Sequence, residues 1–253
     1  MTDLALRPRS PTELVDAAFQ VFRRDPIQFM VGAAAVYVPW LVVRLLFDIG
    51  VSNDLPSQQQ FMTVVVAAVV VYALVGGVVT VMASDVYLGA PADAVRALRV
   101  TAARVVPLLV TGLVMLVFFV VGAILLLLPA LYALARYFAI QQAVVLENAG
   151  SVAAFGRSSQ LSHGVKRHVL NTVLLVLLIT TAISFGVQLL SGLIPSRVLF
   201  NVVVTAMQIV VYPFFGITQT LLYYDIRIRK EGFDVEYLAT ATSAATAQPG
   251  EPL

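Results

Sequence analysis

Residues 105–145 have the sequence VVPLLVTGLVMLVFFVVGAILLLLPALYALARYFAIQQAVV, which is apolar almost throughout. A helix that crosses the hydrocarbon core of a bilayer needs about 20 apolar residues, so this stretch is too long for one crossing. Its main interruption is Pro129. The stretch therefore predicts a hairpin of two transmembrane helices that turns near Pro129, and two more apolar pairs flank it.

The composition agrees with a protein built for the bilayer. Of 253 residues, 60% are hydrophobic and 12% are charged, and the mean hydropathy is +0.91. Soluble domains usually carry about 25% charged residues, so a water-soluble enzyme is excluded. Cysteine is absent, which excludes disulfides and thiolate metal sites, and the two histidines are a poor metal pair. We expect no cofactor, and the small net charge of +2 gives no reason to expect a nucleic acid partner.

The predicted fold class is all-α, a polytopic membrane helical bundle with six transmembrane helices. The predicted crossings are 27–49, 61–84, 105–127, 130–146, 169–191 and 198–224.

The basic residues predict how these crossings are oriented. Thirteen of the sixteen lysines and arginines fall on one side, Arg197 falls on the other, and Arg44 and Arg136 lie within crossings. Basic residues gather in cytoplasmic loops, so both termini are expected in the cytoplasm. The strong preference for arginine over lysine, with abundant Ala, Val and Leu, indicates a GC-rich bacterial genome. The expected location is therefore the bacterial cytoplasmic membrane.

The chain also looks like three copies of one unit, a cytoplasmic amphipathic helix followed by a transmembrane hairpin. The copies cover about 10–86, 90–147 and 150–225 of a single domain, 1–239, which ends in an amphipathic segment, 226–239. Residues 240–253 are rich in Ala, Thr, Ser, Gln and Pro and are expected to be disordered.

Each copy is expected to open with a lead helix. The first begins at Ser10-Pro11, where Glu13 completes a capping box, and ends at Asp25-Pro26. The second is predicted from Pro91. The third is predicted from Ser151 to about His163. Their arginines are expected to face the anionic inner leaflet.

Each copy closes with a carboxylate at the end of its returning crossing: Asp85, Glu147 or Asp225. One interpretation is a ring of acids at the cytoplasmic mouth of the bundle, which would contact a ligand or lipid. The other is that each acid pairs with the basic end of a lead helix and fixes its register.

Arg136 is the other candidate contact residue because it falls inside the fourth predicted crossing. A charge at bilayer depth costs at least about 2.5–3.5 kcal/mol, so Arg136 should face the bundle or a cavity. It could bind an anion or a lipid phosphate, or it could hold neighbouring helices through buried partners.

Arg44 is simpler, because Asp48 lies four residues on and predicts a local ion pair. The span glycines, including Gly122 and Gly186, predict close helix approach, and Tyr223 and Tyr224 predict interfacial aromatics.

Three segments resemble a known family. They are the opening from Pro11-Thr12-Glu13-Leu14 to Asp25-Pro26; the central part, with Pro129-Ala130-Leu131-Tyr132, Arg136, Glu147 and residues 154–164; and the closing part from Tyr223-Tyr224-Asp225 to Asp234. These segments are similar to the bacterial glycerophosphoryl diester phosphodiesterase membrane domain family, and the resemblance covers nearly the whole chain. The family name comes from proteins in which this module is joined to a soluble phosphodiesterase domain. The chain has neither the strands nor the histidines of such a domain, so hydrolysis is not expected.

Two functions remain open. The first is a non-enzymatic membrane module, a scaffold or partner subunit that contacts lipid and has a membrane protein as a possible partner. The alternative is a transporter or channel for a small or lipid-like solute, with Arg136 and the three carboxylates along its path. A hydrated cavity that reaches Arg136 would favour transport, and a dry packed core would favour the scaffold.

Overall fold

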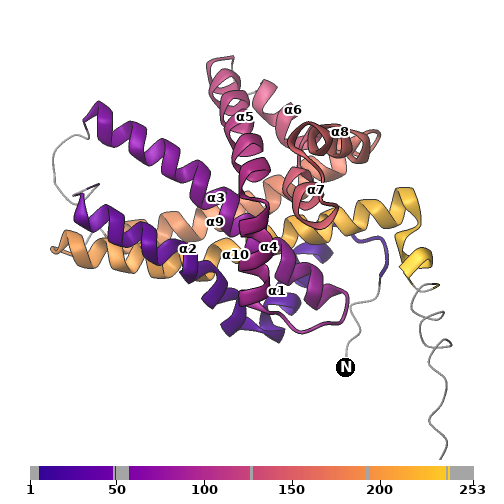
Figure 1. The fold of residues 1–253 in the computed structure, drawn as a ribbon, viewed down its shortest axis with the longest axis horizontal. Coiled ribbons are helices and arrows are strands. Elements are labelled where there is room, and N and C mark those ends of the chain that lie inside the picture. Colours follow the sequence, from indigo (N-terminus) through magenta and orange to yellow (C-terminus); the bar gives the residue numbers. More distant parts are fainter. Residues whose placement is uncertain are drawn as a thin grey trace, which may run out of the picture.

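A computed structural model of the chain describes residues 6–47, 49, 57–125, 128–191, 194–237 and 239. Within these residues every regular element is a helix (Figure 1). The helices are α1 (Pro11–Arg24), α2 (Pro26–Leu46), α3 (Gln58–Tyr87), α4 (Ala94–Ala103), α5 (Val105–Ile124), α6 (Leu128–Arg136), α7 (Ile140–Leu146), α8 (Ser151–Ser162), α9 (Lys166–Ser191) and α10 (Arg197–Glu231).

Five of these helices, α2, α3, α5, α9 and α10, are long and apolar enough to cross a membrane. Four of them, α2, α3, α9 and α10, run along the long axis of the molecule, and α10 packs against the other three. Helix α5 runs in a different direction (Figure 1). The all-helical, multi-pass character predicted from the sequence is thus confirmed.

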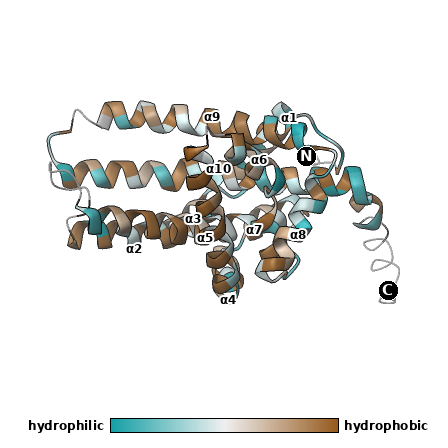
Figure 2. Cartoon of the chain, turned by 90° about the horizontal axis from the view of Figure 1, so that it is seen from above, coloured by the Kyte–Doolittle hydropathy of each residue, from teal (hydrophilic) through white to brown (hydrophobic). Residues whose placement is uncertain are grey.

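The polar part of the molecule lies at one end of this axis. Figure 2 shows hydrophilic residues gathered at α1 and at the C-terminal turns of α10, and these two helices pack against each other. The short helix α8 lies at the same end. The first and last helices therefore meet at this end, while the opposite ends of α2, α3, α9 and α10 extend away from it.

Two lead helices match their predicted bounds, and one does not. In α1, the Ser10 hydroxyl accepts from the Glu13 N–H and the Glu13 carboxylate accepts from the Ser10 N–H, as the capping box predicted. Helix α8 covers Ser151–Ser162. Helix α4 begins at Ala94 and not at Pro91, because the Asp93 carboxylate caps it by accepting from the N–H groups of Val95 and Arg96 at 2.9 and 3.0 Å.

The fourth predicted crossing, 130–146, is wrong as a continuous helix. Helix α6 ends at Arg136 and α7 starts at Ile140, and at 1.5 Å per residue α6 is only about 14 Å long, half the hydrocarbon thickness. The Ser158 hydroxyl of α8 stabilises the break: it accepts from the Ala139 N–H at 3.0 Å and donates to the Arg136 carbonyl at 3.2 Å. A side chain from another helix thus satisfies the backbone groups that the interruption frees.

Glycine permits close packing at some of the predicted positions. A Cβ on Gly122 would lie 2.6 Å from the Ala130 N and Cβ atoms, so α5 and α6 approach closely there. Gly186 differs, because a Cβ on it would meet nothing within 4 Å. The predicted Arg44–Asp48 pair and the tail from 240 onward involve residues outside the described part of the chain.

Candidate functional site

Asp85 lies near the C-terminal end of α3, and its carboxylate forms a salt bridge with Arg96 of α4. Arg96 is largely exposed, whereas the Asp85 side chain is mostly covered. This bond connects the end of a long helix to the first turn of the lead helix that follows it. The pairing fits the second interpretation of the carboxylates.

Glu147 immediately follows α7 and is part of a larger network. It accepts from Nε of Arg157 in α8 at 2.8 and 3.0 Å, and the Tyr223 hydroxyl of α10 donates to it at 2.6 Å. Arg157 also binds Glu231, which accepts from Nε of Arg227 at 2.9 Å. The two carboxylates, Glu231 more than Glu147, raise the pKa of Arg157. The network links α7, α8 and α10 at the polar end of the molecule.

Asp225 is the most buried of the three, with 1% of its surface exposed. It accepts from the Arg9 N–H at 2.6 Å and from Nε of Arg229 at 2.8 Å, and its Oδ2 lies 3.0 Å from Nε2 of His168. Arg229 also donates to the Arg9 carbonyl at 2.8 Å. Asp225 therefore fixes the segment before α1 against α9 and α10.

The three carboxylates share no side-chain partner among the described residues, and each holds a different segment in place. Asp85 holds α4, Glu147 holds α8, and Asp225 holds the chain just before α1. Each accepts from at least one donor of the protein itself. The structure thus gives all three candidates intramolecular partners at the polar end.

Arg136 is the last residue of α6, and its Nη1 donates to the Tyr132 hydroxyl at 2.8 Å. Nζ of Lys166, the first residue of α9, lies 3.3 Å from the same hydroxyl. Because α9 is a candidate membrane span, its first residue belongs at the membrane surface. Arg136 shares this partner with Lys166, and it ends α6 at the point where the predicted crossing is interrupted.

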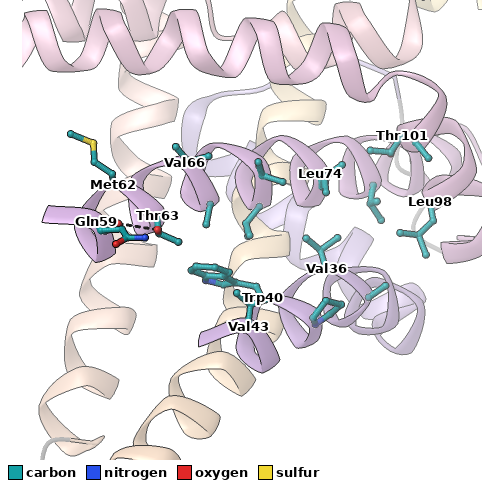
Figure 3. Close-up of a pocket in the computed structure, with 17 residues that line it drawn as sticks. Val36, Trp40, Val43, Gln59, Met62, Thr63, Val66, Leu74, Leu98 and Thr101 are labelled. Carbon is teal, nitrogen blue, oxygen red and sulfur yellow. Dashed lines mark hydrogen bonds between the residues drawn. The ribbon is translucent and has the colours of Figure 1, made fainter. Parts of the chain in front are cut away.

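A groove lies between α2, α3 and α4 (Figure 3). Its volume is about 810 Å³, within the range of about 300–1,000 Å³ typical of small-molecule sites. Trp40 points into it from α2, facing the α3 side chains that include Val66 and Leu74. The polar lining residues are Gln59, Thr63 and Thr101, so the groove suits an apolar occupant.

Two further cavities, of about 580 and 660 Å³, lie on either side of one shared wall. The first lies between α2, α3 and α10, and the second involves α3, α5, α9 and α10. The wall residues common to both are Ala68, Tyr72, Gln141, Tyr212, Phe215 and Gln219. Nε2 of Gln141 donates to the Tyr72 carbonyl at 3.3 Å. Neither Arg136 nor any of the three carboxylates lines these cavities or the groove.

Tyr223 and Tyr224 have hydrogen-bonding roles that their prediction as interfacial aromatics did not include. Both are buried, and Tyr224 forms a 2.6 Å hydrogen bond between its hydroxyl and that of Ser84. They precede the buried Asp225 directly, and this position beside a carboxylate was the one available signal. Trp40 and Ser158 gave no signal, because their importance depends on which helices pack together.

These features define an all-helical protein with five candidate membrane spans and a polar end whose helices are joined by salt bridges and hydrogen bonds. Within the described residues, no group of three or more His, Cys, Asp or Glu side chains is placed to hold a metal ion. No protein-family model matches the chain, and neither the curated proteins nor the solved structures compared with it gave a match.

Proposed function

We propose that the chain is a non-enzymatic integral membrane module of the bacterial cytoplasmic membrane, a scaffold or partner subunit that contacts lipid. The observation that carries this proposal is that the three predicted acids have partners within the protein and lie away from the apolar groove between α2, α3 and α4. Asp85 and Glu147 hold lead helices and Asp225 holds the segment before α1, whereas the groove beside Trp40 is lined almost entirely by apolar side chains. A solute path for a polar substrate would need more polar groups than Gln59, Thr63 and Thr101, which are the polar lining residues of this groove.

The repeated pairing supports the three-unit organisation within this proposal. The acid of the first unit holds the lead helix of the second, that of the second holds the third, and that of the third holds the segment before the first. Six crossings with both termini in the cytoplasm remain part of the proposal, with 130–146 crossing as an interrupted segment. The resemblance to the phosphodiesterase membrane domain family agrees with a module that carries no hydrolytic chemistry.

The occupant proposed for the groove is a lipid acyl chain. Its walls offer valine, leucine and tryptophan side chains, and burying apolar surface against them contributes about 25 cal/mol per Å² wherever the alternative is water. The lining of the groove contains no charged side chain. Its polar residues are Gln59 and Thr63 near one end of α3 and Thr101 of α4. The acyl chain of a membrane lipid can fill such a groove without contacts to charged groups.

Trp40 provides a direct test because it is the only tryptophan in the chain. In liposomes whose lipids carry bromine on the acyl chains, we expect strong quenching of Trp40 fluorescence and little quenching by aqueous iodide. Ala67→Phe, which narrows the groove, should reduce the quenching by brominated lipid. Ala153→Phe, on α8 and away from the groove, is the control. Iodide quenching without brominated-lipid quenching would reject the proposal.

A transporter or channel is the second candidate, and one observation favours it. The two cavities that meet at Tyr72, Gln141 and Gln219 place amides beside an internal space, as a path for a solute would require. Flux of a small or lipid-like solute into proteoliposomes, abolished when Ala68→Phe narrows both cavities, would replace the scaffold proposal with this one.

A further inference from the structure

Two positive side chains from different helices meet at one tyrosine. Nη1 of Arg136 lies 2.8 Å from the Tyr132 hydroxyl oxygen, and Nζ of Lys166 lies 3.3 Å from it. The Lys166 ammonium also lies 4.5 Å from the centroid of the Tyr132 ring, and the Arg136 guanidinium lies 5.6 Å from that of Tyr137. The geometry brings a guanidinium, an ammonium and a phenol within a few ångströms of each other.

No carboxylate forms a salt bridge with Arg136 or Lys166 in the part of the chain that the structure describes. This differs from the polar end near Glu147, where every arginine in the network has an acid partner. Two like charges repel when they share one neutral partner, and an anion between them would remove that repulsion. In addition, Nε of Arg136 is buried without a hydrogen-bond partner.

The three side chains present mainly hydrogen-bond donors. Arginine and lysine donate and do not accept, and the Tyr132 hydroxyl, which already accepts from both, has its own proton to donate. A donor set of this kind, with two positive charges, matches the oxygens of a phosphate group. The planar guanidinium can bind two of those oxygens at once, and the lysine adds a point charge.

The position of the cluster matches the depth of a lipid headgroup. Lys166 is the first residue of a candidate span, so the apolar part of α9 lies on one side of the cluster and the polar end of the molecule on the other. Leu128 and Tyr132 on α6 are exposed beside it, which leaves room for an acyl chain next to the charged groups. Basic side chains at this depth attract anionic headgroups.

We infer that Arg136, Lys166 and Tyr132 form a site for a phosphate group, either that of an anionic phospholipid or free phosphate. The inference rests on the proposed function only for the membrane position of α9. It gives the lipid-contact role a specific site at the headgroup level, separate from the groove beside Trp40.

Native mass spectrometry of the full chain in mild detergent can test this site, with phosphatidylglycerol, phosphatidylcholine and inorganic phosphate as probes. We expect the wild-type chain to retain one phosphatidylglycerol in preference to phosphatidylcholine. Arg136→Gln and Lys166→Gln should each weaken that binding about tenfold, since hydrogen bonds to charged groups are lost. Arg7→Gln, which removes an exposed arginine that lies before α1 and is already paired with Glu13, is the control and should bind like the wild type.

The arms of the experiment separate the two sources of phosphate. Displacement of phosphatidylglycerol by millimolar inorganic phosphate would assign the site to free phosphate, and retention would assign it to lipid. Tyr132→Phe keeps both charges and should weaken binding less than either charge change. If the Arg136→Gln, Lys166→Gln double variant, shown to be folded by its elution and melting, binds phosphatidylglycerol like the wild type, the inference is overturned. Trp40 quenching is independent of this result, so failure of the site and failure of the proposed function are distinguishable.

Discussion

The hydroxyl of Tyr223 lies 2.6 Å from Oε1 of Glu147 and donates a hydrogen bond to it, although 76 residues separate the two in sequence. Tyr223 is fully buried in α10, and Glu147 follows directly after α7. The bond thus joins the end of the middle unit to the last long helix. With Arg157 of α8 on the other side of Glu147, three helices depend on one carboxylate.

Glu147→Gln should destabilise the protein. The substitution removes the charge that Arg157 and Tyr223 share, and hydrogen bonds to charged groups contribute about 1.5–3 kcal/mol each. We expect the free energy of unfolding, measured in detergent by circular dichroism, to fall by about 2 kcal/mol. Asp16→Asn, at an exposed acid of α1, is the control and should change it by less than about 0.5 kcal/mol. Equal stability of the two variants would contradict a structural role for Glu147.

Much of the fold could be predicted from local sequence, and the predictions that were wrong have a physical explanation. The capping box at Ser10 and Glu13 and the long apolar runs of α2, α3 and α10 were predictable because neighbouring residues determine them. The break between α6 and α7 was not, because Ser158 stabilises it from α8. Apolar composition alone cannot distinguish one continuous crossing from two short helices.

The capping box of α1 should make stability depend on acid. The Ser10 N–H first, and then the Arg7 side chain and the Ser10 hydroxyl, lower the pKa of Glu13 from 4.5 to about 2. The stabilisation is fully present above pH 4.5, where the unfolded carboxyl is also ionised, and is lost as pH falls from there through about 2. Glu13→Gln lacks this contribution at every pH.

The measurement is the melting temperature of the wild type and of Glu13→Gln between pH 6 and pH 2.5. We expect the wild type to melt higher at pH 6 and the difference to shrink below pH 4.5. Asp16→Asn serves again as the control, because Asp16 is exposed on the same helix. A difference that stays constant across this range would show that the Glu13 carboxylate does not carry the effect.

Two glycines of the long helices should respond oppositely to alanine. A Cβ on Gly122 would press on the Ala130 backbone at 2.6 Å, so Gly122→Ala must separate α5 from α6 and should cost about 1–3 kcal/mol. Gly186→Ala meets nothing within 4 Å and should stabilise α9 slightly, by about 0.5–1 kcal/mol, because alanine favours helix. Unfolding in detergent measures both. A loss at Gly186 as large as that at Gly122 would argue against this packing.

The candidate site was less predictable than the fold. Asp85, Glu147 and Asp225 could be selected because a charge at the end of an apolar helix is visible in sequence. Their partners could be predicted only in part, since Arg96 and Arg157 lie on the expected lead helices but Tyr223 and His168 depend on tertiary packing. Arg136 was selected because its charge interrupts an apolar run, but the end of α6 at this residue could not be predicted from that run.

The proposed orientation can be tested by cysteine labelling, and the chain suits the method because it contains no cysteine of its own. Gln58 begins α3 at the end of the molecule far from α1, and Val152, which is 89% exposed, lies on α8 near the polar end. Basic residues cluster near α8 and are absent from 45–60, so the positive-inside rule places Gln58 outside the cell and Val152 in the cytoplasm. In intact cells, a membrane-impermeant maleimide should label Gln58→Cys and not Val152→Cys. After the cells are permeabilised, both should react, which shows that each cysteine is accessible.

Labelling of Val152→Cys but not Gln58→Cys in intact cells would reverse the orientation. Labelling of both would mean that an even number of segments crosses between the two positions, as when α3 and α5 cross and 130–146 does not, and would reject the six-crossing arrangement.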